Sequence, residues 1–345
     1  MKQSSPVTMT DVARLAGVSQ ATVSLVLNKT GGKRVSKATQ DRVMSAVEQL
    51  GYRVNSAAKT LREGRSQLIG FLSDRVATSP FAGQIIEGAQ QRASEEGALL
   101  LIVNTGGDAA VEEQAIESLL ARQVDGIVYA AMYHRVLTLP PALHDVSTVV
   151  LNAEVPAADT PAIVPDEFQG GADATRHLIE SGHSRIGFLN VNSLSSRLPA
   201  AVDRFEGYLT ELRAAGLSLD SRYVRHGQGN VEDGFHLAME VLSEAERPTA
   251  LFCGNDRMAW GAYQACQTLG LDIPGDVSIV GFDDQELISH NLRPRLTTVA
   301  LPFLEMGRAA VDALVTGKTD EAEVRKITCP LVTRESVAAP KADRR

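Results

Sequence analysis

The chain has 345 residues, of which 44% are hydrophobic and 22% charged, so it is long enough for more than one domain. It contains no run of about eighteen apolar residues, and its first ten residues lack the apolar stretch of a signal peptide. These features exclude a membrane-spanning protein and predict a cytoplasmic one. The three cysteines, Cys253, Cys266 and Cys329, match neither a disulfide framework nor a zinc knuckle, which predicts buried free thiols.

The net charge of −8 is unevenly distributed. Residues 1–66 carry eleven Lys and Arg against four Asp and Glu, a formal charge of +7, which leaves −15 for the rest of the chain. A basic head on an acidic body indicates that the head meets a polyanion such as nucleic acid. A solvated basic tail is the alternative.

Two short helices are predicted at the start of the head. Thr10 is placed to cap a helix that begins at Asp11, with an apolar face of Val12, Leu15 and Ala16. Gly17 ends this helix and Ser19 caps the next one, so a turn of about three residues joins them. That spacing is typical of a helix-turn-helix unit.

The second helix has two different faces. Val23, Val26 and Leu27 cluster on one side, whereas the other side carries slim or polar side chains. A helix that enters the DNA major groove needs this division, because its bulky side packs on its partners while small and hydrogen-bonding groups meet base edges and phosphates. The groups on the second side are Gln20, Ala21, Ser24, Leu25 and Asn28.

A basic loop with Lys29, Lys33 and Arg34 follows, and Ser36 is predicted to cap a third helix that ends at Gly51. Its inward side chains are expected to be Val43, Ala46, Val47 and Leu50. A short three-helix domain of another kind would share these features. The next segment, 55–64, is too short to persist as an isolated helix in water and needs partners, although an ordinary linker helix with Leu61 packed on the body is the alternative.

From Leu68 onward, short apolar runs alternate with amphipathic segments, which predicts parallel sheets covered by helices on both faces. The tetrapeptide Ile-Gly-Phe-Leu occurs at 69–72 and again at 186–189, and each copy leads into a predicted helix. The repeat indicates two doubly wound α/β subdomains in tandem, with a ligand cleft where the carboxyl ends of their strands meet. The predicted strands are LIGFLSD, ALLLIVN, GIVYAA, STVVLN, RIGFLN, TALFCGND and VSIVGFDD.

Polar and aromatic side chains follow these strands and suit a small polyol or sugar. The candidates for binding an effector are Ser79, Phe81, Asp166, Phe168, Arg197, Arg204, Asn255 and Asp283. Several of them could instead cap helices or brace turns, with Asp256 a candidate cap and Asp283 or Asp284 a candidate turn brace.

Enzyme motifs are absent, since the sequence contains no GxxxxGKS/T, GxSxG, HExxH or strand-linked GxGxxG, and its seven histidines lack ligand spacing. We therefore expect no catalysis, no cofactor and no metal. A solute-binding protein of a sugar transport system is the alternative function, but it predicts an export signal and no basic head.

The head resembles that of the lac and galactose repressor (LacI/GalR) family of bacterial transcription regulators. The matching stretches are VTMTDVARLAGVSQATVSLVLN and RVSKATQDRVMSAVEQLGYRVNSAAKTLREGRS. The resemblance implies that Gln20, Ala21 and Leu25 face bases, with Leu25 offering an apolar contact where the family often has a polar one. It implies that backbone contacts come from Thr10, Ser19, Thr22, Ser24 and Asn28. It also implies a hinge that becomes helical on the operator, in which Asn55 and Ala58 match family positions and Leu61 wedges into the minor groove.

The body resembles the periplasmic-binding-protein-like core of the same family, through SPFAGQIIEGAQ, RFEGY, CGNDRMAWGAYQACQTLGLDIPGDVSIVGFDD and RPRLTTVALP. Positions 81, 166, 204, 255 and 283 match residues that commonly touch the effector. The resemblance implies a homodimeric repressor that binds a pseudo-palindromic operator in double-stranded DNA under control of a sugar-like effector. The expected regions are a headpiece at 8–54, a hinge at 55–67, a core at 68–337 and a tail at 338–345. Within the core, the first subdomain is expected at 68–164 and 292–325, and the second at 165–291 and 326–337.

Overall fold

The computed structural model describes residues 7–28, 35–52, 64–79, 83–156, 160–317 and 324–341. The chain divides into two compact units, residues 1–66 and 67–345, which we call the head and the body. Each is described by itself. The expected basic loop, with Arg34, and most of the expected hinge, with Asn55, Ala58 and Leu61, lie outside the described residues, as does Phe81.

The head consists of three helices around a small apolar core. They are α1 (Met9–Ala16), α2 (Gln20–Leu27) and α3 (Lys37–Leu50). Ser19 and Ser36 cap α2 and α3, and Gly17 and Gly51 end α1 and α3 in the left-handed conformation, as predicted. The core is built from Val12, Ala13, Ala16, Val23, Val43 and Ala46, with Val26, Leu27, Val47 and Leu50 packed against it.

Two details of α1 differ from the prediction. Thr8 rather than Thr10 caps the helix, because Asp11 lies three residues after Thr8 and the two residues form a reciprocal capping box. Leu15 is 51% exposed, and Ala13 lies in the core instead. The helix begins two residues earlier than expected.

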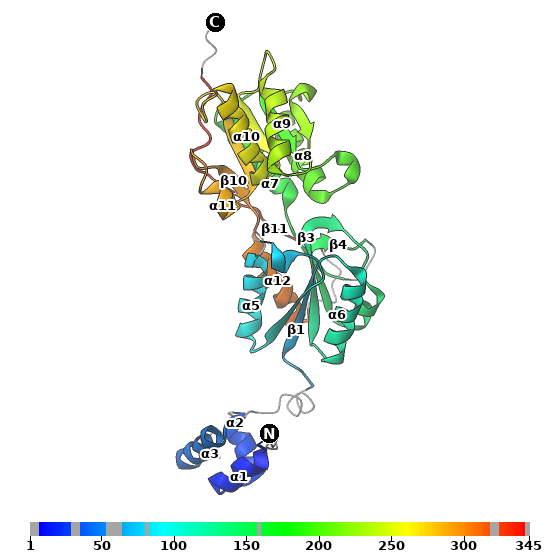
Figure 1. Cartoon of the computed structure of the whole chain (residues 1–345), viewed down its shortest axis with the longest axis vertical. Helices are drawn as coiled ribbons and strands as arrows, with labels where there is room; N and C mark the ends of the chain where they lie inside the picture. Colours follow the sequence, from blue (N-terminus) through cyan, green and yellow to red (C-terminus); the bar gives the residue numbers. More distant parts are fainter. Residues whose placement is uncertain are drawn as a thin grey trace, which may run out of the picture. The chain divides into compact units, whose positions relative to one another are not determined.

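The first lobe of the body is a six-stranded parallel sheet with strand order β11-β5-β4-β3-β1-β2. Helices α5 and α12 pack together on one face, and α6 covers the other (Figure 1). The strands are β1 (Leu68–Ser73), β2 (Leu99–Asn104), β3 (Gly126–Val136), β4 (Thr148–Glu154), β5 (Ala162–Pro165) and β11 (Val324–Ile327). The helices are α5 (Gly83–Glu95), α6 (Ala109–Ala121) and α12 (Phe303–Thr316), with short 3-10 turns η2 (Val76–Thr78) and η3 (Pro141–Asp145).

The second lobe repeats this order as β12-β10-β9-β8-β6-β7, with β12 the one antiparallel strand of its described part. The two Ile-Gly-Phe-Leu copies lie in β1 and β6, which occupy the same place in their sheets. The strands are β6 (Ile186–Asn190), β7 (Val224–His226), β8 (Ala250–Cys253), β9 (Ser278–Asp283), β10 (Thr297–Ala300) and β12 (Leu331–Val332). The helices are α7 (Glu167–Glu180), α8 (Pro199–Ala214), α9 (Val231–Leu242), α10 (Asp256–Leu269) and α11 (Glu286–Ser289), with 3-10 turns η4 (Leu194–Ser196) and η5 (Ser221–Tyr223).

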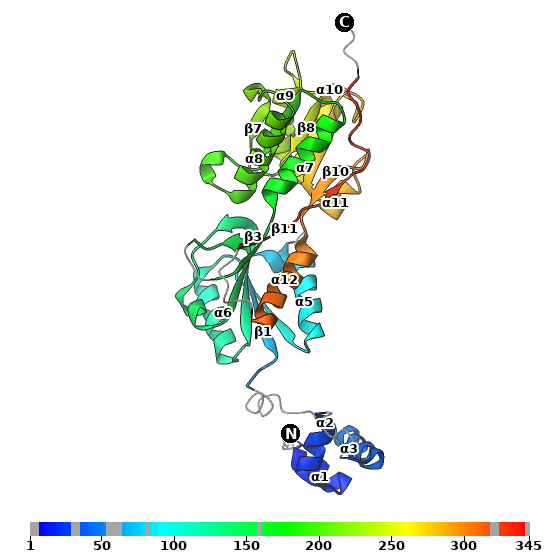
Figure 2. The same ribbon diagram turned by 180° about the vertical axis from the view of Figure 1, so that it is seen from behind.

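The chain passes between the lobes after β5, after β10 and after β11 (Figure 2). The range 292–325, expected in the first subdomain, therefore contains β10, which pairs with β9 in the second sheet. The chain returns to the first lobe only at α12, which packs on α5. The three cysteines are buried and free, as predicted.

Glycines allow three helix pairs to pack at very close range. A Cβ atom at each of these positions would collide with a backbone carbonyl of the partner helix. The pairs are Gly88 and Gly307 between α5 and α12, Gly171 and Gly207 between α7 and α8, and Gly234 and Gly261 between α9 and α10. Because the obstacle is backbone, rotamer changes cannot relieve it.

The α7–α8 contact gives a direct test of this packing. We expect Gly207→Ala to lower the free energy of unfolding by about 1–3 kcal/mol, since its Cβ would meet the carbonyl of Phe168. Gly83→Ala, in open space on α5, is the matched control and should be neutral or slightly stabilising. Urea denaturation of both variants measures the difference, and equal stabilities would contradict the proposed close packing.

Candidate DNA interface and ligand cleft

Helix α2 has the two faces that its sequence predicts. Val23 is fully buried, whereas Gln20 and Ala21 are exposed and Ser24 and Leu25 are partly exposed. The outward face thus presents an amide, a methyl group, a hydroxyl and a small apolar side chain. Groups of this size and kind can reach base edges in a major groove.

The remaining described DNA candidates lie around the ends of α2. Ser19 Oγ accepts a hydrogen bond from the Thr22 backbone nitrogen at 3.1 Å and lies 2.9 Å from Thr22 Oγ1. Asn28 Nδ2 donates to the Ser24 carbonyl at 2.8 Å. The Gln20 amide donates to Thr10 Oγ1, which links α1 to the start of α2. Thr10 therefore supports the position of Gln20 instead of capping a helix.

The body contains a cleft of about 610 Å³ that is lined by residues of both lobes. Four predicted effector residues line it, namely Ser79, Arg204, Asn255 and Asp283. The other described candidates do not. Asp166 caps α7 through the Gln169 backbone nitrogen at 3.1 Å, and Phe168 and Arg197 are exposed on the surface.

Arg204 is the centre of a buried charge network. It is 4% exposed, its Nε donates to Glu167 Oε2 at 2.7 Å, and one Nη lies 3.6 Å from Asp283 Oδ1. The same guanidinium donates to the Gly254 carbonyl and stacks 3.7 Å from the centroid of the Phe282 ring. These contacts hold Arg204 rigidly at the base of the cleft.

Glu167 connects this network to the first lobe. Its Oε1 lies 3.7 Å from Nδ1 of His134 on β3, and His134 Nε2 lies 3.1 Å from Glu154 Oε1 on β4. Burial opposes ionisation of Glu167, but the charge of Arg204 and the contact with His134 outweigh it and lower the pKa of Glu167. Burial likewise opposes protonation of His134, yet Glu154 and Glu167 together raise the pKa of His134 to about 9. A protonated imidazole therefore bridges carboxylates of the two lobes at neutral pH.

The His134 bridge predicts a pH dependence. Because the pKa of His134 rises from 6.5 to about 9 on folding, its stabilisation is complete below about pH 6.5 and is lost as the pH rises through 9. The size is of the order of 3 kcal/mol. We expect the difference in unfolding free energy between the wild type and His134→Gln to shrink between pH 6 and pH 9.5. A difference that stays constant would mean that the imidazole is neutral.

Asp283 and Asn255 reach the cleft from the strand ends of the second lobe. Asp283 has a φ of 108°, a strained conformation for a residue other than glycine, and its Oδ2 accepts from the Gln285 amide at 2.8 Å. Burial raises the pKa of Asp283 to about 6, against the opposing charge of Arg204. Asn255, and not Asp256, caps α10, because Asn255 Oδ1 accepts from the Met258 backbone nitrogen at 2.8 Å.

Two neighbouring aspartates have structural roles. Asp256 is buried and accepts hydrogen bonds from the Gln285 backbone nitrogen and from the Thr298 hydroxyl, each at 2.6 Å. Asp284 braces the turn after β9 by accepting from Ser289 at 2.7 Å and from Arg334 at 2.8 Å.

Several cleft residues were missed by sequence reasoning. Arg75, Arg135 and Arg257 carry no local motif, and His134 and Asn152 lie at the ends of β3 and β4 without a distinguishing pattern. Glu167 had a usable signal, since it follows the predicted Asp166 and lies in the first turn of an amphipathic helix. Among the described residues, no group of His, Cys, Asp and Glu could hold a metal ion, and no helix could cross a membrane.

A three-helix unit with an exposed slim helix, joined to two like α/β lobes around a polar cleft, defines a ligand-responsive DNA-binding regulator. Comparisons with known proteins agree. Residues 8–55 match the family model of bacterial regulatory proteins of the lacI family, and residues 66–335 match that of periplasmic binding proteins and the sugar binding domain of the LacI family. The chain belongs to the LacI family of transcriptional regulators.

Individual relatives cover nearly the whole chain. The HTH-type transcriptional regulator GalR of Escherichia coli K12 is 36% identical, with 96% of each chain covered, and the ribose operon repressor of Haemophilus influenzae is 35% identical, with 89% of this chain and 91% of the relative covered. The structure of the lac repressor dimer bound to operator and an anti-inducer covers 97% of this chain and 100% of its own, at 30% identity and a TM-score of 0.76. The cellobiose complex of the regulator CelR aligns with a TM-score of 0.67 at 30% identity over 96% of this chain and 99% of its own.

Proposed function

We propose that this regulator acts as a homodimeric repressor in the cytoplasm and binds a pseudo-palindromic operator through α2. A sugar-like ligand that fills the cleft either lowers or raises its affinity for the operator. The observation that carries the proposal is the combination of an exposed α2 face with a cleft lined from both lobes. A ligand that contacts both lobes stabilises one relative position of the lobes. If the protein binds DNA more tightly in one of these positions than in the other, the ligand cleft and the DNA-binding site are energetically coupled.

The base-reading side chains in this proposal are Gln20, Ala21 and Leu25. Ser19, Thr22, Ser24 and Asn28 are proposed to hold the DNA backbone, with Thr10 supporting Gln20. Arg34 remains a proposal based on the predicted basic loop, and Asn55, Ala58 and Leu61 remain proposals based on the family resemblance. The ligand is proposed to contact Ser79, Arg204, Asn255 and Asp283, with Phe81 retained on the resemblance.

A homodimer is supported by apolar side chains that remain exposed in the body. Leu99 and Ile102 project from β2, the edge strand of the first sheet, and Leu287 on α11 is 69% exposed. Apolar groups on an edge strand form a surface that a second subunit can cover. A solute-binding protein for transport has no use for the helix-turn-helix head, so this alternative is not favoured.

Selection of tight-binding sequences from random DNA tests the proposal. We expect the selected DNA to contain two inverted half-sites, and the dissociation constant to rise on the order of a thousandfold between about 50 and 200 mM salt through phosphate contacts. One compound of a sugar panel should change the affinity. Sequence-independent binding without a salt dependence would refute the proposed function, as would turnover of a sugar by the purified protein.

A further inference from the structure

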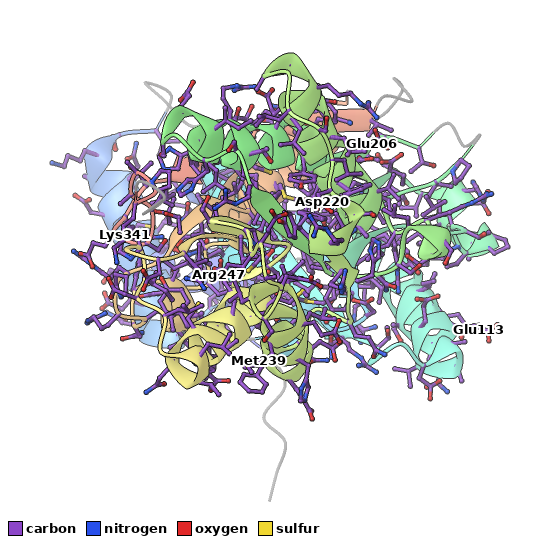
Figure 3. The ribbon with its side chains drawn as sticks, turned by 90° about the horizontal axis from the view of Figure 1, so that it is seen from above. Glu113, Glu206, Asp220, Met239, Arg247 and Lys341 are labelled. Atoms are coloured by element: carbon purple, nitrogen blue, oxygen red, sulfur yellow. The ribbon has the colours of Figure 1, made fainter. Side chains whose placement is uncertain are left out.

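The lining of the cleft is cationic, although the body as a whole is strongly acidic. Residues after 66 carry a formal charge of −15, and acidic side chains such as Glu113 and Glu206 are exposed on the outer surface (Figure 3). The cleft, in contrast, is lined by four arginines and a histidine against two carboxylates. A local excess of positive charge in an acidic protein concentrates anions at that place.

Part of this charge is already neutralised. Arg204 pairs with Glu167 at 2.7 Å, and Arg135 pairs with Asp74 at 3.0 Å. His134 lies between Glu154 and Glu167. These contacts neutralise the charge of Glu167. Asp283 is therefore the cleft carboxylate that is most available to a ligand.

Two arginines form no ion pair within 4 Å with a carboxylate in the described part of the chain, although the charge of Arg257 acts on Asp283. Arg75 follows β1 in the first lobe, and its Nε donates only a long hydrogen bond of 3.5 Å to the Gly106 carbonyl. Arg257 lies in the first turn of α10 in the second lobe, and its Nε is buried with no hydrogen-bond partner. A buried donor without a partner is costly, and because Arg257 also lines the cleft, the charge of an anionic ligand there would compensate its guanidinium group.

Resting on the proposed function of the cleft, we propose that its ligand is an anionic carbohydrate, with a phosphate or carboxylate group bound by the guanidinium groups of Arg75 and Arg257. Guanidinium binds both anions through charge-assisted, often bidentate hydrogen bonds. Asp283 accepts hydrogen bonds from the sugar hydroxyls. The two arginines belong to different lobes, so binding of one anion by both draws the lobes together.

The two carboxylates that line the cleft do not oppose this ligand strongly. Glu167 is neutralised by Arg204 and His134, and Asp283 lies 3.6 Å from an Arg204 nitrogen. The raised pKa of Asp283, about 6, further reduces its charge in mildly acidic solution.

The test uses the full chain and matched compounds for glucose, galactose and ribose: the neutral sugar, its aldonate and its terminal phosphate. Binding is measured by calorimetry and by the ligand-induced rise in unfolding temperature. We expect an anionic member of at least one set to bind at least tenfold more tightly than its neutral sugar. A preference for the phosphate or for the aldonate identifies the source of the anion.

Substitutions of the two arginines test whether they bind the anionic group of the ligand. Arg75→Gln and Arg257→Gln should each weaken binding of the anionic compound by roughly 10- to 100-fold, since a charged hydrogen bond contributes about 1.5–3 kcal/mol. Arg222→Gln, an exposed arginine outside the cleft, is the control with the same charge change and should bind normally. If a neutral sugar binds and none of the variants changes its affinity, the proposal of an anionic ligand would be overturned, but the proposed function would remain. Failure of every compound to bind would overturn the anionic ligand, whereas the DNA selection described above tests the proposed function separately.

Discussion

Arg204→Ala is expected to lower the free energy of unfolding of the body by about 3–5 kcal/mol. The substitution leaves Glu167, which is 1% exposed, without the guanidinium that neutralises it. His134, on the opposite side, compensates only in part because its ring already contacts Glu154. Urea denaturation followed through Trp260, the single tryptophan, measures the loss.

The matched control for this prediction is the double variant Arg204→Met with Glu167→Gln. Removing both charges of the pair leaves neither partner as an unpaired ion, so much of the lost stability should return, although Asp283 still loses its 3.6 Å contact with Arg204. A single variant as stable as the wild type would show that the ion pair contributes little. The double variant also separates stability from ligand binding, because a folded body that no longer responds to ligand assigns the Arg204–Glu167 pair, which lines the cleft, to ligand binding.

Val23→Asn is expected to abolish specific DNA binding while ligand binding to the body persists. Val23 is fully buried at the centre of the head, and replacing it loses apolar burial and buries an amide, together about 3–5 kcal/mol. A headpiece of this size has only about 3–7 kcal/mol of stability. Fluorescence anisotropy with a labelled operator should show a loss of affinity of at least a hundredfold.

Leu15→Asn is the matched control, because this leucine lies on α1 of the same head but is half exposed. It should bind operator almost normally. The ligand-induced rise in the unfolding temperature of the body, followed through Trp260, should be the same in both variants. A lost ligand response in Val23→Asn would contradict the independence of the two units.

Local sequence determined the helices of the head and the main strands of the body. Ser19, Ser36, Gly17 and Gly51 act within one turn of their own helices, so neighbouring residues suffice to predict them. The seven apolar runs predicted as strands are all strands, and the Ile-Gly-Phe-Leu repeat identified the two like lobes. Thr10 was a wrong cap because Thr8 also fits the pattern, and the position of Asp11 decides between them.

Strands β5, β7, β10, β11 and β12 were not predicted. They have two to four residues each, which gives too short a window for periodicity, and β11 exposes most of its side chains. Their places in the sheets depend on the strands beside them. For the same reason, the sequence could not show that β10 pairs in the second lobe.

The cleft shows the same division between local and tertiary information. Ser79, Arg204, Asn255 and Asp283 follow or face predicted strand ends and line the cleft, whereas Asp166, Phe168 and Arg197, chosen by the same reasoning, do not. The bridge from Arg204 through Glu167 and His134 to Glu154 joins four elements of two lobes, and Arg204 and Glu167 are 37 positions apart in the sequence. Only the folded chain brings these charges together, because burial and mutual distance, which set their ionisation, are properties of packing and not of neighbouring residues.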